Sequence, residues 1–163
     1  MMRFLIALFY ACSIFSHDIV GFWKSIDEDS GIARCVVAIY EYQDKCYGRI
    51  IGSFDAEGNM HDTIYHPLTR APGVVGDPYY SGLDIIWNLE DNGSSHDGKI
   101  LDPENGKIYR AELWRDDENL VVRGKLFLFF RSQTWLPALS SDFPKDFKMP
   151  DLSKLVPKIP EVK

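Results

Sequence analysis

The sequence has few of the features that reveal a reaction. Its 163 residues include only three cysteines and four histidines, with no Ser-His-Asp order, no glycine-rich phosphate loop and no strong zinc-ligand spacing. Basic side chains number 18 against 24 acidic ones, so the net charge of -6 argues against a surface that follows nucleic-acid phosphates. We therefore predict no nucleic-acid partner, no metal, no cofactor and no catalytic residue, and an enzyme is the weakest functional hypothesis.

Helical patterns and long apolar runs are also missing. No stretch repeats apolar residues with the 3.6-residue period of a helix, whereas 12 glycines, 9 prolines and 13% aromatic residues separate short runs typical of strands. The length and the 45% hydrophobic content suit one compact domain. The apolar run at residues 4–12 is shorter than the roughly 20 residues of a membrane-spanning helix, so no span is expected in the mature protein.

Residues 1–16 have the layout of a removable signal peptide. A cation at Arg3 precedes the apolar run, and Ser13-Ile14-Phe15-Ser16 follows it before the polar His17 and Asp18. Cleavage near Ser16 would leave 17 basic and 24 acidic residues, a net charge of 17 - 24 = -7, and would leave the protein in the periplasm. The alternative is a lipoprotein anchored at Cys12, although the bulky Tyr10 stands where such sites usually have a small residue.

Turn residues between short apolar runs predict successive hairpins. In the stretch 98–109, Pro103 and the pair Asn105-Gly106 favour a tight reversal. Residues 107–135 then alternate as a β-meander with a reversal at 116–119. Earlier in the chain, residues 34–51 form a second hairpin around the two-residue loop Gln43-Asp44.

The loop at Gln43-Asp44 fixes the register of its hairpin. Glu41 then pairs with Cys46, which leaves Cys35 about 20 Å from Cys46 along the strands, so two free thiols are predicted. One face of the hairpin is small and apolar. The other is expected to be a solvated outer face, or else an amphipathic ligand surface, and it carries Val36, Ala38, Tyr40, Tyr42, Lys45, Tyr47, Arg49 and Ile51.

Two segments lack strand patterns. Residues 52–81 read as a long loop, a candidate lid or binding loop, in which His61 and His66 are interpreted as surface histidines rather than metal ligands. Residues 137–163 contain five prolines and form an arm that is either extended along the acidic body or disordered.

Several motifs together resemble a known family of small exported bacterial proteins. They are Gly21-x-Trp23, Tyr47-Gly48-Arg49-Ile50, the run from Asp102-Pro103 through Asn105-Gly106-Lys107 to Tyr109, Leu120-x-Val122-Arg123-Gly124, and Arg131-Ser132-Gln133-Thr134-Trp135. The family is catalogued as domain of unknown function two-one-four-seven. The resemblance implies a calycin-type barrel, related to lipocalins, and carries no established activity.

The family resemblance also assigns structural roles. In lipocalins an arginine from the last strand covers the tryptophan of Gly-x-Trp at one end of the barrel, and Gly21, Trp23 and Arg131 stand at matching places. The resemblance implies that Asp102, Pro103, Asn105 and Gly106 build the turn of the signature. These residues are therefore predicted to be architectural.

Strand closure gives an independent reason to expect a barrel. About eight short antiparallel strands must either leave two exposed edges or close on themselves. We therefore predict an all-β fold, a single antiparallel up-and-down β-barrel of the lipocalin and calycin type. Its domains are a signal peptide at 1–16, the barrel at 17–136 and an extended or disordered tail at 137–163.

The leading functional hypothesis is an exported, non-catalytic barrel that binds a lipid-like or amphipathic acid ligand. An aromatic and cationic lining is expected from Tyr40, Tyr47, Arg49, Trp87, Arg110, Trp114 and Arg123. The alternative is a cell-envelope interaction module with a solid barrel, whose tail docks on a partner protein. The anchors of that tail would be Phe143, Phe147, Leu152, Leu155 and Val156.

Overall fold

The computed structural model describes residues 18–163, so the predicted signal peptide and Cys12 lie outside the described residues. The regular secondary structure of the described chain is almost entirely strand, in agreement with the predicted all-β fold class. Its strands are β1 (Gly21–Ile26), β2 (Ala33–Tyr42), β3 (Lys45–Phe54), β4 (Met60–Thr63), β5 (Asp84–Asp91), β6 (His96–Asp102), β7 (Lys107–Asp116), β8 (Asn119–Leu126) and β9 (Phe129–Pro137). Two 3-10 turns follow, η1 (Ser140–Asp142) and η2 (Leu152–Lys154).

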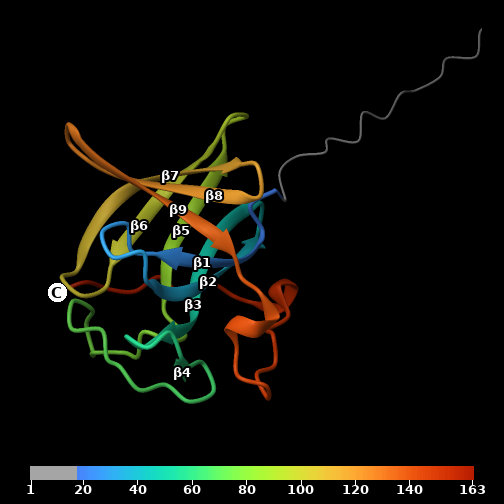
Figure 1. The fold of residues 1–163 in the computed structure, drawn as a ribbon. Coiled ribbons are helices and arrows are strands. Elements are labelled where there is room, and N and C mark those ends of the chain that lie inside the picture. The colour runs from blue at the N-terminus through green and yellow to red at the C-terminus, as the bar shows by residue number, and fades with distance from the viewer. Residues whose placement is uncertain (1–17) are drawn as a thin grey trace, which may run out of the picture.

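The strands close into an antiparallel barrel (Figure 1). Strands that are consecutive in sequence pair with one another around the barrel, except that β3 pairs directly with β5. The short β4 pairs only with β3 and lies outside the ring of strands. Closure is made by β1, which pairs with β2 on one side and with β9 on the other, where Trp23 lies opposite Pro137. The predicted up-and-down barrel of about eight strands is confirmed.

The β2–β3 hairpin has the predicted loop and register. Gln43 and Asp44 have φ angles of 49° and 64°, the left-handed backbone that a two-residue loop of this kind requires. Glu41 lies opposite Cys46, as expected, and both Cys35 and Cys46 are free thiols. The predictions of register and of unpaired cysteines in this hairpin are confirmed.

The β6–β7 turn is the contact point for the long segment before β5. The amide of Gly106, at φ 74°, donates to the carbonyl of Asp102 and closes the turn. The amide of Gly73 donates to the carbonyl of Pro103 at 3.0 Å, and the backbones come so close that a Cβ at Gly73 would clash with Gly106. Because neither position has room for a side chain, glycine at both lets the segment rest on the turn.

The outer face of the β2–β3 hairpin differs from the expectation of a solvated surface. Val36, Ala38 and Ile51 have no exposed area, and they form a second apolar cluster with Met60. The chain itself covers this face, because side chains of the tail pack on the cluster, among them Ala138, Phe143, Phe147 and Leu152. The prediction of a solvated face is therefore wrong for these positions, since a sequence pattern does not show what a distant segment covers.

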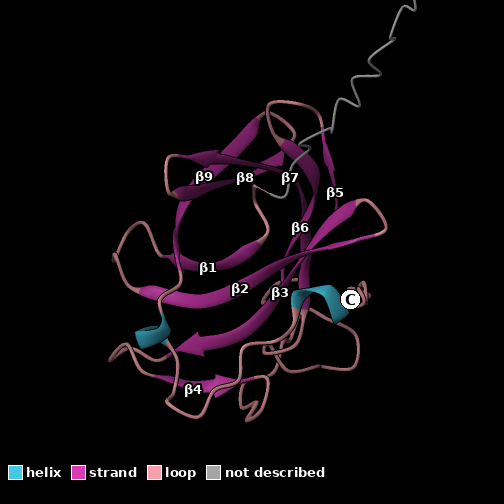
Figure 2. Cartoon of the chain, turned by 90° about the vertical axis from the view of Figure 1, so that its right-hand side faces the viewer, coloured by secondary structure: helices cyan, strands magenta, loops and turns pink. Residues whose placement is uncertain are grey.

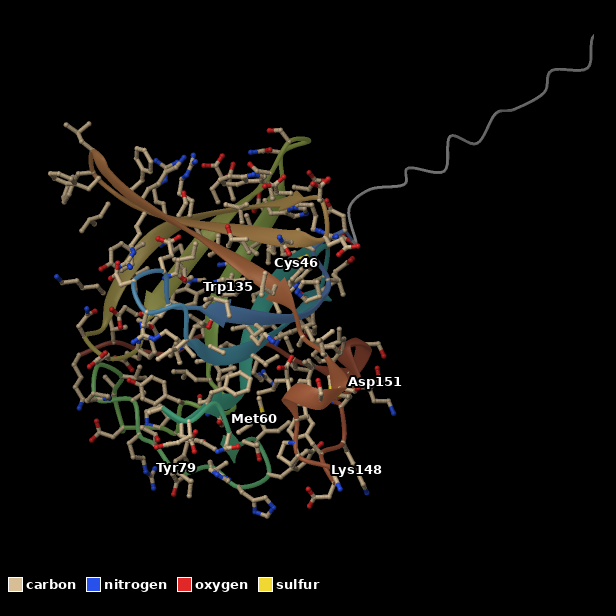
Figure 3. All side chains as sticks on the ribbon, viewed as in Figure 1. Cys46, Met60, Tyr79, Trp135, Lys148 and Asp151 are labelled. Carbon is tan, nitrogen blue, oxygen red and sulfur yellow. The ribbon has the colours of Figure 1, made fainter. Side chains whose placement is uncertain are left out.

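The tail runs across the outside of the barrel to the opposite side (Figure 2). Figure 3 shows Lys148 and Asp151 of the tail on the same side of the molecule as Met60. The turn η2 packs on β2, the carbonyl of Val156 accepts a 2.7 Å bond from Arg49, and Val162 forms a bridge with Val74. Within residues 18–163, no helix is both long and apolar enough to cross a membrane.

Candidate functional site

The up-and-down order puts the connections between strands alternately at two ends of the barrel. The connections at 43–44, 92–95 and 117–118 share one end, which we call the closed end. The connections at 27–32, 103–106 and 127–128 share the other, which we call the open end. The two ends differ in how they are filled.

The closed end is sealed by Trp23. Its side chain is 4% exposed, and its indole Nε1 donates to the carbonyl of Ile19 at 2.8 Å. The guanidinium of Arg115 lies over the indole, 5.1 Å from the ring centroid, and also donates to the carbonyl of Asp18 at 2.8 Å. Cation–π contact and these bonds close the barrel here.

The arginine over Trp23 is therefore Arg115 of β7, whereas Arg131 of β9 was expected. Arg131 stands near the 127–128 connection at the open end, where it approaches Asp29 at 3.7 Å. The difference arises because β9 enters the barrel from the open end, so its first residues are remote from Trp23.

The open end contains a pocket of about 410 Å³. Most of the pocket's side chains belong to the inner face of the barrel, because the cross-strand pairs Ile100–Tyr109, Val122–Gln133 and Gly124–Arg131 put them on one side of the sheet. The lining residues are Arg34, Ile85, Ile100, Leu101, Asp102, Pro103, Glu104, Tyr109, Val122, Gly124, Arg131, Gln133 and Trp135.

The inner part of this pocket is largely apolar. Trp135, which Figure 3 labels among the barrel strands, is 3% exposed, and its Nε1 donates to Oε1 of Gln133 at 3.1 Å. Gly124 leaves space on the wall, since a Cβ there would stand 3.6 Å from Cβ of Tyr109 and 3.9 Å from Cγ2 of Ile100. Any longer side chain at Gly124 would enter the pocket.

The rim of the pocket carries two exposed arginines. The side chains of Arg34 and Arg131 are 63% and 61% exposed, and each approaches one carboxylate of the 27–32 loop, Asp27 or Asp29, at 3.7 Å. Hydrogen bonds from Ser30 lower the pKa of Asp27 below its usual value, so this carboxylate stays ionised. Because both ion pairs are long and exposed, the two guanidinium groups are able to turn toward an anion.

None of the seven residues predicted as a ligand lining belongs to this pocket. Cross-strand pairing places all of them on the outer face of the barrel, opposite to the inner residues that line it. Trp87 lies opposite Lys99 on this face and is 4% exposed. The other six form two separate groups, namely Tyr40, Tyr47 and Arg49 on one side and Arg110, Trp114 and Arg123 on the other.

The first outer group surrounds a buried carboxylate. Asp84, 1% exposed, accepts bonds from the hydroxyl of Tyr40 at 2.8 Å, from both Nε and Nη2 of Arg49, and from the amide of Lys158 at 2.8 Å. Tyr47 stacks on Tyr40 and bonds Asn88. Burial, followed by the charge of Asp84, raises the pKa of Tyr40 well above its usual value. This cluster holds the tail to the barrel.

The second outer group is a half-buried stack. The guanidinium of Arg123 lies 4.7 Å from the ring centroid of Trp114 and 5.1 Å from that of Phe130, and its Nε donates to Ser132 at 2.9 Å. Arg110 pairs with Lys125 on the same face. These contacts leave the group outside the barrel interior.

A signal for the pocket residues is present in the sequence. The prediction missed it because it selected aromatic and cationic side chains. In β7 and β8 the apolar alternate set, with Tyr109, Ala111, Val122 and Gly124, faces inward. The predicted lining residues were taken from the other alternate positions of these strands, which carry the arginines. Selecting the apolar parity of each strand would have found the pocket wall, because a barrel interior is lined by every second residue.

Other hollows are present in residues 18–163, among them one of about 280 Å³ beside the 27–32 loop. One of about 530 Å³ lies in the closed end of the barrel, where the inner-face residues Glu41, Cys46, Leu89 and His96 line it together with Asp44 and Asp91. One of about 480 Å³ lies between β4 and the tail beside Phe147. In residues 18–163, no three or more histidines, cysteines or carboxylates gather as a metal site. The closed-end hollow is lined by the carboxylates Glu41, Asp44 and Asp91, whereas the open-end pocket joins an apolar wall to two rim arginines, so we take the open-end pocket as the candidate binding site.

Comparisons with known proteins agree with this fold. A family model described as an uncharacterized protein conserved in bacteria (DUF2147) matches residues 21–136. A solved structure, described as protein HP1028 from the human pathogen Helicobacter pylori that belongs to the lipocalin family, is similar with a TM-score of 0.60 at 16% identity. The similarity covers 78% of this chain and 87% of that chain, and shows the fold. No curated protein matches the sequence.

Proposed function

This chain belongs to the DUF2147 family, and we propose from its open-end pocket that it is an exported, non-catalytic protein that binds a small amphipathic acid. The observation that carries the proposal is the pocket itself, apolar inside and bordered by Arg34 and Arg131. A lipocalin-like barrel is a fold suited to small ligands in general.

The dimensions support one small ligand. A volume of about 410 Å³ lies within the range of roughly 300–1,000 Å³ that is usual for small-molecule sites. The wall offers Ile100, Val122 and Trp135 to an apolar chain, while the rim offers guanidinium groups to a carboxylate or another anion.

The two parts of the site contribute differently. Each methylene transferred from water to the wall is worth about 0.8 kcal/mol, so six of them supply about 5 kcal/mol. Each exposed arginine adds only about 0.2–1 kcal/mol. The apolar chain therefore supplies most of the affinity, and Arg34 and Arg131 select the charge of the head group.

Native mass spectrometry of the protein purified gently from its own cells tests the proposal in one measurement. We expect a protein mass that begins near His17, from removal of residues 1–16, together with an adduct of lipid-like mass. Fatty acids and lipids added to the emptied protein should raise its melting temperature. An acylated Cys12 would move the protein to a membrane surface, and an uncleaved Met1 would refute export. Absence of both an adduct and any thermal shift would refute ligand binding.

The tail does not favour the alternative of a docking module. Phe143, Phe147, Leu152 and Leu155 pack on the barrel of the same chain, and only Val156 of the five expected anchors is mostly exposed, at 59%. The contacts of these side chains give the tail a role within the fold, so we propose only the ligand-binding function.

A further inference from the structure

The connection between β8 and β9 presents an apolar tip that projects from the open end. Figure 1 shows the orange hairpin extending beyond the other strands. Five successive apolar residues occupy it, with exposed fractions that reach 95%, namely Leu126, Phe127, Leu128, Phe129 and Phe130. Exposed apolar patches of this kind mark contact sites, because burying them is favourable.

Packing within the fold does not explain why these five positions are apolar. Pairing of β7 with β8 ends at Arg110 and Lys125, so beyond this point the hairpin is a two-strand overhang with only Leu126 and Phe129 opposite one another. The loop position Phe127 has φ 53°, a backbone that favours glycine in a two-residue loop. A phenylalanine at this position therefore opposes the local turn preference and contributes no buried packing.

Cations surround the base of the tip. Lys125 and Arg131 flank the apolar run, Arg110 lies opposite Lys125, and Arg123 stacks on Phe130. Two carboxylates contact these groups, since Glu112 pairs with Lys125 and Arg123, and Asp29 approaches Arg131. Although the whole chain has a net charge of -6, its apolar tip is bordered by positive charge.

We propose that the β8–β9 tip inserts into the surface of a phospholipid bilayer that contains anionic lipids. The leucines and phenylalanines at the end of the tip would contact the acyl chains. The cations at its base would then lie at the level of the anionic head groups. A protein partner fits less well, because a standard interface uses about 20–30 residues on each side and the tip offers five side chains.

Membrane docking would also bring the ligand pocket to the bilayer. Gly124 and Arg131, which line the pocket, pair with one another only two positions behind Leu126 and Phe129. The pocket rim is therefore next to the tip. If the proposed ligand binding is correct, the ligand class is an acyl-chain lipid that exchanges between the bilayer and the barrel.

Vesicle flotation with the processed protein tests the docking. The probe is a vesicle of equal parts phosphatidylcholine and phosphatidylglycerol, and the variant is Phe127→Ser with Leu128→Ser, because serine suits a loop and changes no charge. The matched control is Leu68→Ser with Val75→Ser, two residues that are 64% and 49% exposed elsewhere. We expect the tip variant to lose at least about tenfold in partitioning and the control less than about twofold.

Three results would overturn the proposal. They are no binding of the wild-type protein to these vesicles, equal binding by the tip variant, and wild-type self-association in size-exclusion chromatography that the tip variant abolishes. Decanoate binding in vesicle-free solution separates this proposal from the pocket. The tip variant should bind decanoate as the wild type does, and a protein that binds vesicles through the tip but never binds decanoate would refute only the pocket.

Discussion

A carboxylate as buried as Asp84 is tolerated because its oxygens are fully engaged. Removing a charge from water costs several kcal/mol, and only close partners offset that cost. Arg49 supplies two bonds and the opposite charge, Tyr40 supplies a third bond, and the amide of Lys158 supplies a fourth. The last of these links the barrel to a residue 74 positions away in sequence, so one buried acid fixes the path of the tail.

Titration of Cys46 should make the protein sensitive to alkali. Burial, and then the nearby carboxylate of Glu41, raises the pKa of Cys46 to about 12. In the unfolded chain a thiol loses its proton near pH 8.5, so above this pH the folded state retains a proton that the unfolded state releases. Cys46 alone therefore lowers the free energy of unfolding as the pH rises from about 9 to 12, by up to about 1.4 kcal/mol per pH unit.

Urea denaturation at about pH 8 and about pH 10.5 measures this loss of stability. In Cys46→Ala the decrease between the two pH values should be smaller by about 2 kcal/mol, because the titrating group is gone. The raised pKa of Tyr40 adds a loss of the same sign above pH 10 in both proteins. An identical pH profile in the two proteins would show that Cys46 does not keep its proton on folding.

Among the elements, the hairpins could be predicted from the sequence and the covering of their faces could not. Turn residues such as Gln43-Asp44 and Asn105-Gly106 act locally, so loop and register follow from a few neighbouring positions. The covering of Val36 and Ala38 by Phe143 and Phe147 joins segments more than 100 residues apart. Strand periodicity shows that a face exists and does not show which segment packs on it.

The tail should stabilise the fold through its phenylalanines. Phe147 lies 4.8 Å from the ring of Phe143 and 5.2 Å from that of Tyr65, on the second apolar cluster. Because its ring is only partly buried, Phe147→Ala should lower the free energy of unfolding by roughly 1–3 kcal/mol, measured by urea denaturation.

Val156→Ala is the matched control for the tail. The Val156 side chain is 59% exposed, and its carbonyl, which accepts the bond from Arg49, is retained in the variant. Its effect should stay within about 0.5 kcal/mol. Equal effects of the two substitutions would mean that the phenylalanine packing does not hold the tail on the barrel.

For the whole molecule, closure of the barrel could be predicted from the number of strands and the need to avoid exposed sheet edges. The position of the candidate site could not be predicted in this way. The predicted lining was taken from the alternate positions that include Arg110, Trp114 and Arg123. In the closed barrel these positions face outward. The same closure places Arg115 at the closed end and Arg131 at the open end. Only the three-dimensional order of the strands separates a sealing arginine from one that borders a pocket.

The most direct test of ligand binding is a calorimetric titration of decanoate into three proteins. Gly124→Val adds an isopropyl group beside Tyr109 and Ile100 without backbone strain, so it narrows the pocket. Arg123→Leu changes the opposite face of the same strand. We predict that Gly124→Val weakens decanoate binding by more than about tenfold and that Arg123→Leu changes it by less than about twofold. Wild-type affinity in Gly124→Val, with its melting temperature unchanged, would contradict the assignment of the ligand to the open end of the barrel.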